Sequence, residues 1–404
     1  MKKLFDFLKN EIVLVVAMLL AIVSMFIVTP DAQYIDYIDF RTLGILFCLM
    51  AVMAGLQDIG IFREIAEALL SKVNKLWQII MILVMLCFFF SMLITNDVAL
   101  ITFVPFTFII LGLLGEEAEK KLIIPVVVMQ TIAANLGSML TPIGNPQNLY
   151  LYGKAGMGIG EFIRILLPYS LVSFILLAGY CLYLGRRSSG DGKTDNKGTS
   201  TYETADDEAG DSQTVAMIQF THMTEKTHLK GAKNRWIGYV ILFLLCLLVV
   251  ANILDYRVVL IITLIYLLCL ERAMLTKIDY SLLLTFVGFF VFIGNMGRVP
   301  AFRGLLQSII EGNEMLTAVV ASQVISNVPA ALLLSGFTDN IEALILGTNL
   351  GGLGTLIASM ASLISYKYIV KENKCSKGAY FGFFTLANGV FLVILLGVWI
   401  LLSI

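Results

Sequence analysis

The chain has 404 residues, of which 58% are hydrophobic and only 14% are charged, and its formal net charge at neutral pH is −1. A soluble globular protein carries about 45–50% apolar and about 25% charged residues, so this composition excludes an ordinary soluble enzyme. The near-zero net charge and the lack of a basic tract suited to phosphate also argue against a nucleic-acid partner. We therefore predict an all-α polytopic membrane protein that is embedded in a lipid bilayer.

Apolar runs recur along the whole chain. A helix needs roughly 20 mostly apolar residues to cross about 30 Å of hydrocarbon. The first run follows basic residues, as a secretory signal would, but it is long for a signal and has no small-residue cleavage site. We therefore expect a retained helix there. Runs of suitable length lie at about 11–29, 41–57, 77–94, 98–114, 122–152, 164–185, 236–254, 257–271, 281–297, 314–338, 340–370 and 379–403.

Three of these runs are interrupted by polar residues, glycine or proline. The breaks lie at 141–146 (Thr-Pro-Ile-Gly-Asn-Pro), at 326–329 (Ser-Asn-Val-Pro) and at 349–355 (Asn-Leu-Gly-Gly-Leu-Gly-Thr). Inside lipid, a broken helix is tolerated only where protein or a wet cavity satisfies the freed backbone groups. The sequence therefore predicts two interrupted transmembrane helices and two polar hairpin tips beside a solvated cavity, in which tips from both halves of the chain meet.

Short motifs recur in the same order in the two halves of the chain. The Asn-Leu-Gly motif at 135–137 recurs at 349–351, and the segment 93–96 resembles 324–327. Each Asn-Leu-Gly motif opens one of the breaks. We interpret this shared order as an internal duplication.

The two repeats are expected to have opposite orientations. We interpret 1–185 as the first transmembrane repeat, with a re-entrant hairpin at 77–114, and 186–235 as a disordered, polar cytoplasmic linker. Residues 236–404 would hold a connector helix and the second repeat, with its hairpin at 314–338. The connector adds one crossing, which inverts the second repeat, as in many secondary transporters. The arms of the first hairpin are nearly long enough to cross the bilayer, so two full spans fit equally well.

The basic residues support this topology, because cytoplasmic loops carry an excess of Lys and Arg. We expect the cytoplasmic membrane, with the N-terminus and the linker in the cytoplasm and the C-terminus outside. The cytoplasmic side would hold Lys2, Lys3, Lys9, Arg63, Lys72, Lys75, Lys120, Lys121, Arg186, Arg187, Lys230, Lys233, Arg235, Arg272, Lys277, Lys367, Lys371, Lys374 and Lys377. The opposite side would hold the acidic 31–40 loop with Lys154, Arg257, Arg298 and Arg303.

Thr95, Asn96 and Asp97 form the polar tip of the first hairpin. A central Asp costs about 2.5–3.5 kcal/mol in a membrane helix, so such a residue usually faces a wet cavity, pairs with a cation or stays protonated. We therefore interpret Asp97 as a sodium or proton site. A structural role, in which Asp97 caps the following helix by accepting backbone N–H bonds, is compatible with this function.

The other breaks offer helix ends, amides and hydroxyl groups without any Lys or Arg. A half-helix N-terminus carries free N–H groups and a partial positive charge that suit an anion, whereas exposed carbonyls suit Na⁺. A proline kink and close helix packing at glycine are the structural alternatives. Substrate-binding candidates are Thr95, Asn96, Thr141, Gly144, Asn145, Ser326, Asn327, Pro329, Gly352, Gly354 and Thr355. Candidates for binding the coupling cation or proton are Asp97, Asn96, Asn145, Asn327 and Asn349.

At these residues the chain resembles the ion transporter superfamily, which includes divalent anion/sodium symporters, citrate transporters, arsenite permeases and NhaD-type sodium/proton antiporters. The resemblance covers nearly the whole chain outside the linker.

In the divalent-anion branch, a Ser-Asn-Thr motif at each hairpin tip meets the substrate, which implies this role for 95–96 and 326–327. Asp97 and Val328 depart from the third position of that motif, so the resemblance implies weaker support for a dicarboxylate. Asn-Asp at the first tip looks closer to arsenite permeases and NhaD-type antiporters. The resemblance also implies a homodimer whose transport domains move against a scaffold.

We expect a secondary active transporter that moves a small anion, either a citrate-like carboxylate or an inorganic oxyanion, by alternating access coupled to Na⁺ or H⁺. An arsenite efflux permease and a Na⁺/H⁺ antiporter are the closest alternatives, and a channel is a further one because broken helices also form filters. We expect no enzyme, because Asp97 is the single deep carboxylate and both histidines lie in the linker. No cofactor beyond the coupling ion and no transition metal are expected, since the chain has no Cys/His cluster.

Overall fold

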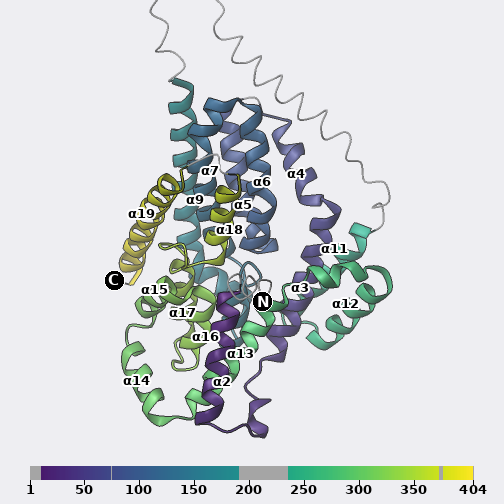
Figure 1. Ribbon diagram of the computed structural model, residues 1–404, viewed down its shortest axis with the longest axis vertical. Helices are drawn as coiled ribbons and strands as arrows, with labels where there is room; N and C mark the ends of the chain where they lie inside the picture. The colour runs from purple at the N-terminus through teal and green to yellow at the C-terminus, as the bar shows by residue number, and fades with distance from the viewer. Residues whose placement is uncertain (1–10, 74, 191–234, 373–375, 404) are drawn as a thin grey trace, which may run out of the picture. The chain divides into compact units, whose positions relative to one another are not determined.

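The computed structural model describes residues 11–73, 75–190, 235–372 and 376–403. Every regular element within these residues is a helix, and none is a strand, which confirms the predicted all-α class (Figure 1). The helices form two compact units, and each unit takes segments from both halves of the chain. Unit 1 comprises Met1–Asp58, Pro146–Ile165 and Asn234–Gly352, and unit 2 comprises Ile59–Asn145, Leu166–Lys233 and Leu353–Ile404.

Unit 1 contains two groups of helices beside the contacting elements α11, α12 and η3. The first group pairs α2 with α13 along much of their length, and the second group packs α15, α16 and α17 together with α8. The contacts of α13 with α16 join the two groups. The elements of unit 1 are α2 (Ile12–Ile27), η1 (Ala32–Tyr34), α3 (Phe40–Ile59), α8 (Pro146–Ala155), α11 (Arg235–Val250), α12 (Tyr256–Leu270), η3 (Arg272–Lys277), α13 (Tyr280–Gly297), α14 (Pro300–Ile310), α15 (Glu314–Ile325), α16 (Asn327–Ser335) and α17 (Ile341–Leu350).

Unit 2 is organised around α7, which packs against α5, α6, α18 and α19. The apolar window of α7 is 83% buried, more than that of any other candidate span in the described residues. Its elements are α4 (Ile61–Leu70), α5 (Leu76–Ile94), α6 (Asn96–Leu113), α7 (Glu116–Ser138), most of α9 (Ile159–Gly190), α18 (Met360–Glu372) and α19 (Lys377–Ser403). Polar groups on α7 must therefore find partners inside the protein, because little of this helix faces lipid.

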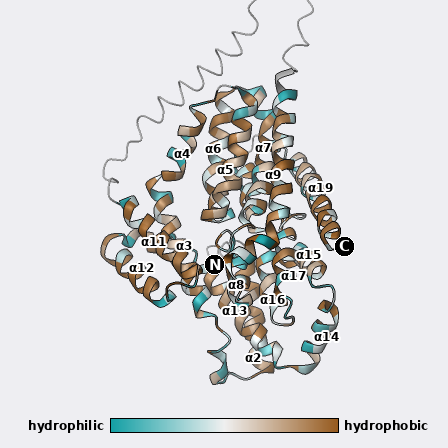
Figure 2. Ribbon diagram, turned by 180° about the vertical axis from the view of Figure 1, so that it is seen from behind, coloured by the Kyte–Doolittle hydropathy of each residue, from teal (hydrophilic) through white to brown (hydrophobic). Residues whose placement is uncertain are grey.

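Seven helices in the described part of the chain are long and apolar enough to cross a membrane, namely α3, α5, α6, α7, α9, α13 and α19. Large apolar side chains are exposed along α19 and also along α11 and α12, where Figure 2 shows hydrophobic residues in brown. Exposure of this kind is unfavourable in water and favourable in hydrocarbon. These observations confirm the predicted polytopic membrane protein.

Both predicted interruptions are present. The first long run ends as α7 at Ser138 and resumes as α8 at Pro146, and the second ends as α17 at Leu350 and resumes as α18 at Met360. The residues of each break form turns and bends, because glycine and proline cannot continue the helical ladder without losing stability or a donor.

The two predicted hairpins are also present as pairs of helices. The chain turns at Thr95 between α5 and α6, and at Ser326 between α15 and α16, and the two arms of each pair pack together. At 1.5 Å per residue the arms of the first pair are about 27–28 Å long, whereas those of the second are about 14–18 Å. The arms of the second pair are shorter than the roughly 20 residues that a spanning helix needs. The re-entrance of both pairs stays a prediction.

The predicted linker falls mostly on residues 191–234, which lie outside the described residues. The linker was expected to begin at residue 186, but α9 continues to Gly190, so residues 186–190 are helical. The inverted relation of the two repeats and the side of the membrane on which the termini lie stay predictions.

Candidate functional site

The turns at Thr95 and Ser326 have the same unusual backbone geometry. Thr95 has φ 74° and ψ 150°, and Ser326 has φ 73° and ψ 154°. This region is essentially restricted to glycine, and a residue with a side chain is strained there by about 1–3 kcal/mol. Each of these residues ends one helix and begins the next, and each precedes a buried Asn, Asn96 or Asn327. A shared strain of this kind, at residues that the sequence pairs with each other, marks the two turns as functional candidates.

In unit 2 the first tip is fixed to the break after α7. The backbone N–H of Asn96 donates to the carbonyl oxygen of Gly144 at 3.2 Å, and its side-chain amide donates to Asn135 Oδ1 at 3.1 Å. The hydroxyl of Ser359, which lies just before α18, donates to the same Asn135 oxygen at 2.9 Å. Asn135 therefore joins the first tip to the start of α18.

Two further hydrogen bonds hold the break itself. The Thr141 hydroxyl donates to the carbonyl oxygen of Met92 at 2.5 Å, and the Asn145 amide donates to Ser138 Oγ at 2.7 Å. Gly144 is required for this packing, because a Cβ atom at this position would lie 2.1 Å from the Ser138 carbonyl oxygen. The predicted residues Thr141, Gly144 and Asn145 thus lie together beside the first tip.

Asp97 occupies the first turn of α6, half-buried, directly after the strained Thr95. Its backbone N–H donates to Asn96 Oδ1 at 2.8 Å. A carboxylate in the first turn of a helix is stabilised by the partial positive charge of the helix N-terminus. The helix N-terminus thus lowers the cost of a negative charge at the deep location that the sequence predicts for Asp97. The carboxylate lies beside the tip.

In unit 1 the second tip packs on the break after α17 in the corresponding way. Gln323, one turn before the tip, donates to the Gly351 carbonyl oxygen at 2.9 Å. A Cβ atom on Gly352 would lie 3.1 Å from Asn327 Nδ2, so the Asn327 amide lies directly against the glycine backbone. The Asn349 amide donates to Asn148 Oδ1 and to the Ile345 carbonyl oxygen, each at 2.7 Å.

The two units repeat one arrangement. In each, the Asn of an Asn-Leu-Gly motif bonds a polar residue that follows the other interruption: Asn135 bonds Ser359, and Asn349 bonds Asn148. The side-chain oxygens of Asn145 and Asn349 are buried and have no hydrogen-bond partner among the described residues. Buried polar atoms without a partner usually indicate a bound water or ion. Amide oxygens of this kind are suitable ligands for Na⁺, and we find both at the breaks.

The predicted candidates fall into two sets, one in each unit. Asn135, Asn148 and Ser359 join these sets although the site prediction omitted them, and for Asn135 the repeated Asn-Leu-Gly motif was the available signal. Gly354 and Thr355 lie in the break before α18, and Gly354 has φ 108°. Unit 2 holds Thr95, Asn96, Asp97, Thr141, Gly144, Asn145, Gly354 and Thr355, and unit 1 holds Ser326, Asn327, Pro329, Asn349 and Gly352.

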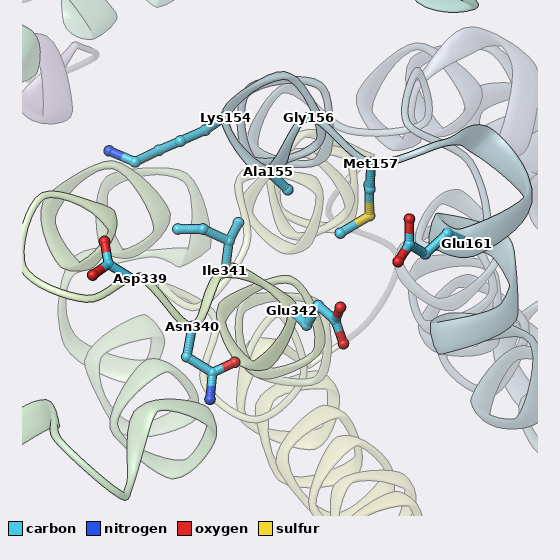
Figure 3. Close-up of a pocket in the computed structure, with 9 residues that line it drawn as sticks. All are labelled: Lys154, Ala155, Gly156, Met157, Glu161, Asp339, Asn340, Ile341 and Glu342. Atoms are coloured by element: carbon cyan, nitrogen blue, oxygen red, sulfur yellow. The ribbon is translucent and has the colours of Figure 1, made fainter.

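A separate pocket of about 440 Å³ lies in unit 1, between the end of α8 and the start of α17, and it contains none of the predicted site residues (Figure 3). Lys154 and Asp339 lie on one side of it and Glu161 on the other. Burial lowers the pKa of the Lys154 ammonium group, and the nearby Asp339 carboxylate opposes this shift. Among the described residues, no group of three or more His, Cys, Asp or Glu side chains could hold a metal ion.

Apolar spanning helices, two interrupted helices and two strained polar tips define a polytopic membrane protein of the transporter class. Residues 7–343 match the model of the citrate transporter family, and the chain belongs to this family.

Several proteins of known sequence are similar to this chain. An uncharacterized transporter of Methanocaldococcus jannaschii is 32% identical over 340 residues, which cover 82% of this chain and 81% of the relative. The inner membrane protein YbiR of Escherichia coli is 28% identical over 349 residues, covering 85% of this chain and 84% of the relative. The silicon efflux transporter LSI3 of Oryza sativa is 29% identical over 160 residues, covering 39% of this chain and 32% of the relative. These findings identify a membrane transporter of the citrate and anion permease type.

Proposed function

We propose that this transporter is a secondary active carrier, which moves a small anion across the cytoplasmic membrane by alternating access coupled to Na⁺ or H⁺. The observation that carries the proposal is the pair of strained tips, Thr95–Asn96 and Ser326–Asn327, each packed on the break of an interrupted helix. Both tips begin a helix, and helix N-termini offer free N–H groups and a partial positive charge to an anion. That both tips bind the same solute stays a prediction from the sequence.

The proposed coupling ion is bound close to the same residues. The unpartnered oxygens of Asn145 and Asn349 favour a hard cation such as Na⁺, because unwound helix ends and amide oxygens coordinate this ion in transporters. The Asp97 carboxylate beside the first tip favours a proton or a second cation. Cation binding at these groups would also offset the charge of an anionic substrate, since no Lys or Arg occurs in either tip or either break.

The substrate class follows from the family and from the tips. Membership in the citrate transporter family favours a citrate-like carboxylate. A second candidate is the efflux or exchange of a small inorganic oxyacid, as in an arsenite permease. Two observations favour it: Asp97 places a negative charge beside the first tip, and a relative carries the name silicon efflux transporter. For a third candidate, Na⁺/H⁺ antiport, the one supporting observation is the position of Asp97.

Uptake into proteoliposomes tests these proposals. Wild type and the Asp97→Asn variant are compared for uptake of citrate and of arsenite under imposed Na⁺ and pH gradients, with the exposed Asp36→Asn as a control that removes a carboxylate far from either tip in sequence. We expect gradient-driven uptake of one anion in wild type and in Asp36→Asn, and at least a tenfold loss in Asp97→Asn. Uptake that does not saturate with the anion concentration and responds to neither gradient would contradict a coupled carrier and favour a channel. Na⁺ flux that depends on pH without any anion would favour the antiporter.

The proposed homodimer is tested separately, by native mass spectrometry of the protein released from detergent. A mass of twice 44.6 kDa is expected for the dimer. A mass that stays at that of one chain over a wide range of protein concentration would contradict it.

A further inference from the structure

Unit 2 contains a row of buried hydroxyl groups that leads away from the first tip. Ser359, Ser362 and Ser365 follow one another at intervals of three residues, so Ser362 and Ser365 lie on one side of α18 and Ser359 directly precedes that helix. Ser359 donates to Asn135 Oδ1 at 2.9 Å, and the hydroxyls of Thr131 and Ser365 are 2.7 Å apart. The row therefore runs along the contact between α18 and α7, and all of these residues are buried.

The middle of this row is incomplete. Because Ser359 pairs with Asn135 and Ser365 with Thr131, the two helices run in opposite directions and Ser362 lies between the two bonded pairs. Ser362 is fully buried, and its hydroxyl has no hydrogen-bond partner among the described residues. The Ser362 hydroxyl thus lies between two helices, and no described residue forms a hydrogen bond with it.

A second unsatisfied hydroxyl lies at the far end of the row. Tyr380, near the start of α19, is fully buried, and α19 packs on α7 and on α18. Its hydroxyl interacts with Thr131, but it has no hydrogen-bond partner within the described residues. Two buried hydroxyls without proper partners therefore flank the Thr131–Ser365 pair.

Hydroxyl groups that only hold membrane helices together are bonded across the interface or to their own backbone. Buried polar atoms are nearly always satisfied by protein or by ordered water, so orphan hydroxyls in a polar row indicate water. Each hydroxyl can also donate and accept at the same time. A row of hydroxyls completed by water is thus able to pass protons.

We infer that α7, α18 and α19 enclose a row of bound water molecules, which conducts protons between Ser359, beside the first tip, and Tyr380 at the start of α19. The Asn135 amide oxygen carries no proton, so it only accepts the hydrogen bond of Ser359 and takes no part in the relay. In each step an oxygen accepts a proton from one neighbour and releases its own proton to the next, so that no charge remains behind. The inference rests on the proposed function and deepens it, because it makes H⁺ the coupling ion and gives its route.

The charged groups of the surrounding helices lie at the ends of this route. Between Asn135 and Ser365 the row passes no charged side chain of α7 or α18, and the aromatic ring of Tyr366 packs on Tyr380. The charged residues of the helices that enclose the row or pack on α7 are Asp97 on α6, Glu116, Glu117, Glu119, Lys120 and Lys121 on α7, Lys367, Lys371 and Glu372 on α18, and Lys377 on α19.

Cysteine labelling tests the water row without measuring transport. A thiol reacts as the thiolate, which forms in water and not in hydrocarbon. We compare Ser362→Cys with Leu363→Cys, its half-buried neighbour on another side of α18, using methanethiosulfonate ethylammonium and peptide mass spectrometry to read each position. Labelling at position 362 is expected to be at least tenfold faster than at 363. Equal rates would overturn the water row whether or not the protein carries an anion.

Uptake driven by a pH gradient tests the proton route. Ser362→Val replaces the hydroxyl with an apolar group, Tyr380→Phe removes only an oxygen atom, and Leu363→Val is the matched control. We expect at least a tenfold loss of pH-driven uptake in the first two variants and none in the control. Unchanged uptake in both Ser362→Val and Tyr380→Phe would overturn the proton route. Absence of any coupled uptake in wild type would contradict the proposed function instead, and the labelling rates then decide on the water row alone.

Discussion

The side-chain amide of Asn96 donates a hydrogen bond to Asn135 Oδ1 at 3.1 Å, and this bond ties the turn between α5 and α6 to the last turns of α7. The same Asn135 oxygen accepts the Ser359 hydroxyl. One oxygen atom thus sets the position of the tip relative to α7 and to the residue that precedes α18, which belong to two different interrupted helices. A residue that holds a tip in this way should be sensitive to truncation.

Replacing Asn135 should therefore destabilise unit 2 more than replacing either of its donors. Asn135→Ala leaves the Asn96 amide and the Ser359 hydroxyl buried without an acceptor, at a cost of about 1–3 kcal/mol for each orphan donor. Ser359→Ala removes one donor and should cost about 1 kcal/mol. Thermal unfolding in detergent ranks the variants by their loss of stability. In the double variant Asn96→Ala/Asn135→Ala the cost should be smaller than the sum of the single costs, and strict additivity would contradict the direct coupling.

The strained turn gives a second prediction. Thr95→Gly relieves a backbone conformation that costs about 1–3 kcal/mol, so it should be more stable than Thr95→Ala, which keeps the strain and also lacks the hydroxyl. Transport should fall in both variants, because both lose the hydroxyl and glycine also loosens the tip. The comparison uses melting temperatures and initial uptake rates. A glycine variant no more stable than the alanine variant would show that Thr95 is not strained.

Gly144 gives a third prediction, because its hydrogen atom faces a backbone oxygen. Gly144→Ala would place a Cβ atom 2.1 Å from the Ser138 carbonyl oxygen, and since backbone cannot give way easily we expect a loss at the upper end of about 1–3 kcal/mol. Gly160 is the matched control, since nothing lies within 4 Å of its would-be Cβ. Gly160→Ala lies in the first turn of α9, where glycine costs less than in a helix interior, so it should leave the stability unchanged or raise it slightly. Similar melting temperatures for the two variants would contradict the close packing at the break.

The pocket in unit 1 gives a prediction on pH. Burial lowers the pKa of Lys154 below its ordinary value, and the Asp339 carboxylate raises it. Removing that carboxylate with Asp339→Asn should lower the Lys154 pKa further, so the neutral, nucleophilic amine appears at lower pH. Acylation of Lys154, followed by mass spectrometry between pH 7 and pH 11, should have its midpoint shifted to lower pH in the variant. A midpoint that stays or moves upward would contradict the proposed proximity of the two groups.

Much of the architecture was predictable because lipid restricts the chain so strongly. The interruptions at 141–146 and 349–355 were visible as Gly, Pro and Asn within apolar runs, and the tips were visible as Thr95–Asn96 and Ser326–Asn327. Their close packing on the breaks was not visible. The Asn135–Ser359 bond joins residues 224 positions apart, and no local pattern specifies such a pair.

The backbone of the tips was equally hidden from the sequence. Thr and Ser are not residues that a local rule would place in a conformation favoured by glycine, so Thr95 and Ser326 predict an ordinary helix start. Tertiary packing overrides the local preference there. The serines of α18 were missed for a different reason: within an apolar helix a serine reads as a small packing residue, and only its unsatisfied hydroxyl at position 362 distinguishes it.

The two interruptions also divide the chain between its compact units. The chain passes from unit 2 to unit 1 between Asn145 and Pro146, and at a later crossing it passes from unit 1 to unit 2 between Gly352 and Leu353. A solute held by the Asn145 amide or by the backbone at Gly352 would thus be bound at a residue that lies next to one of these crossings.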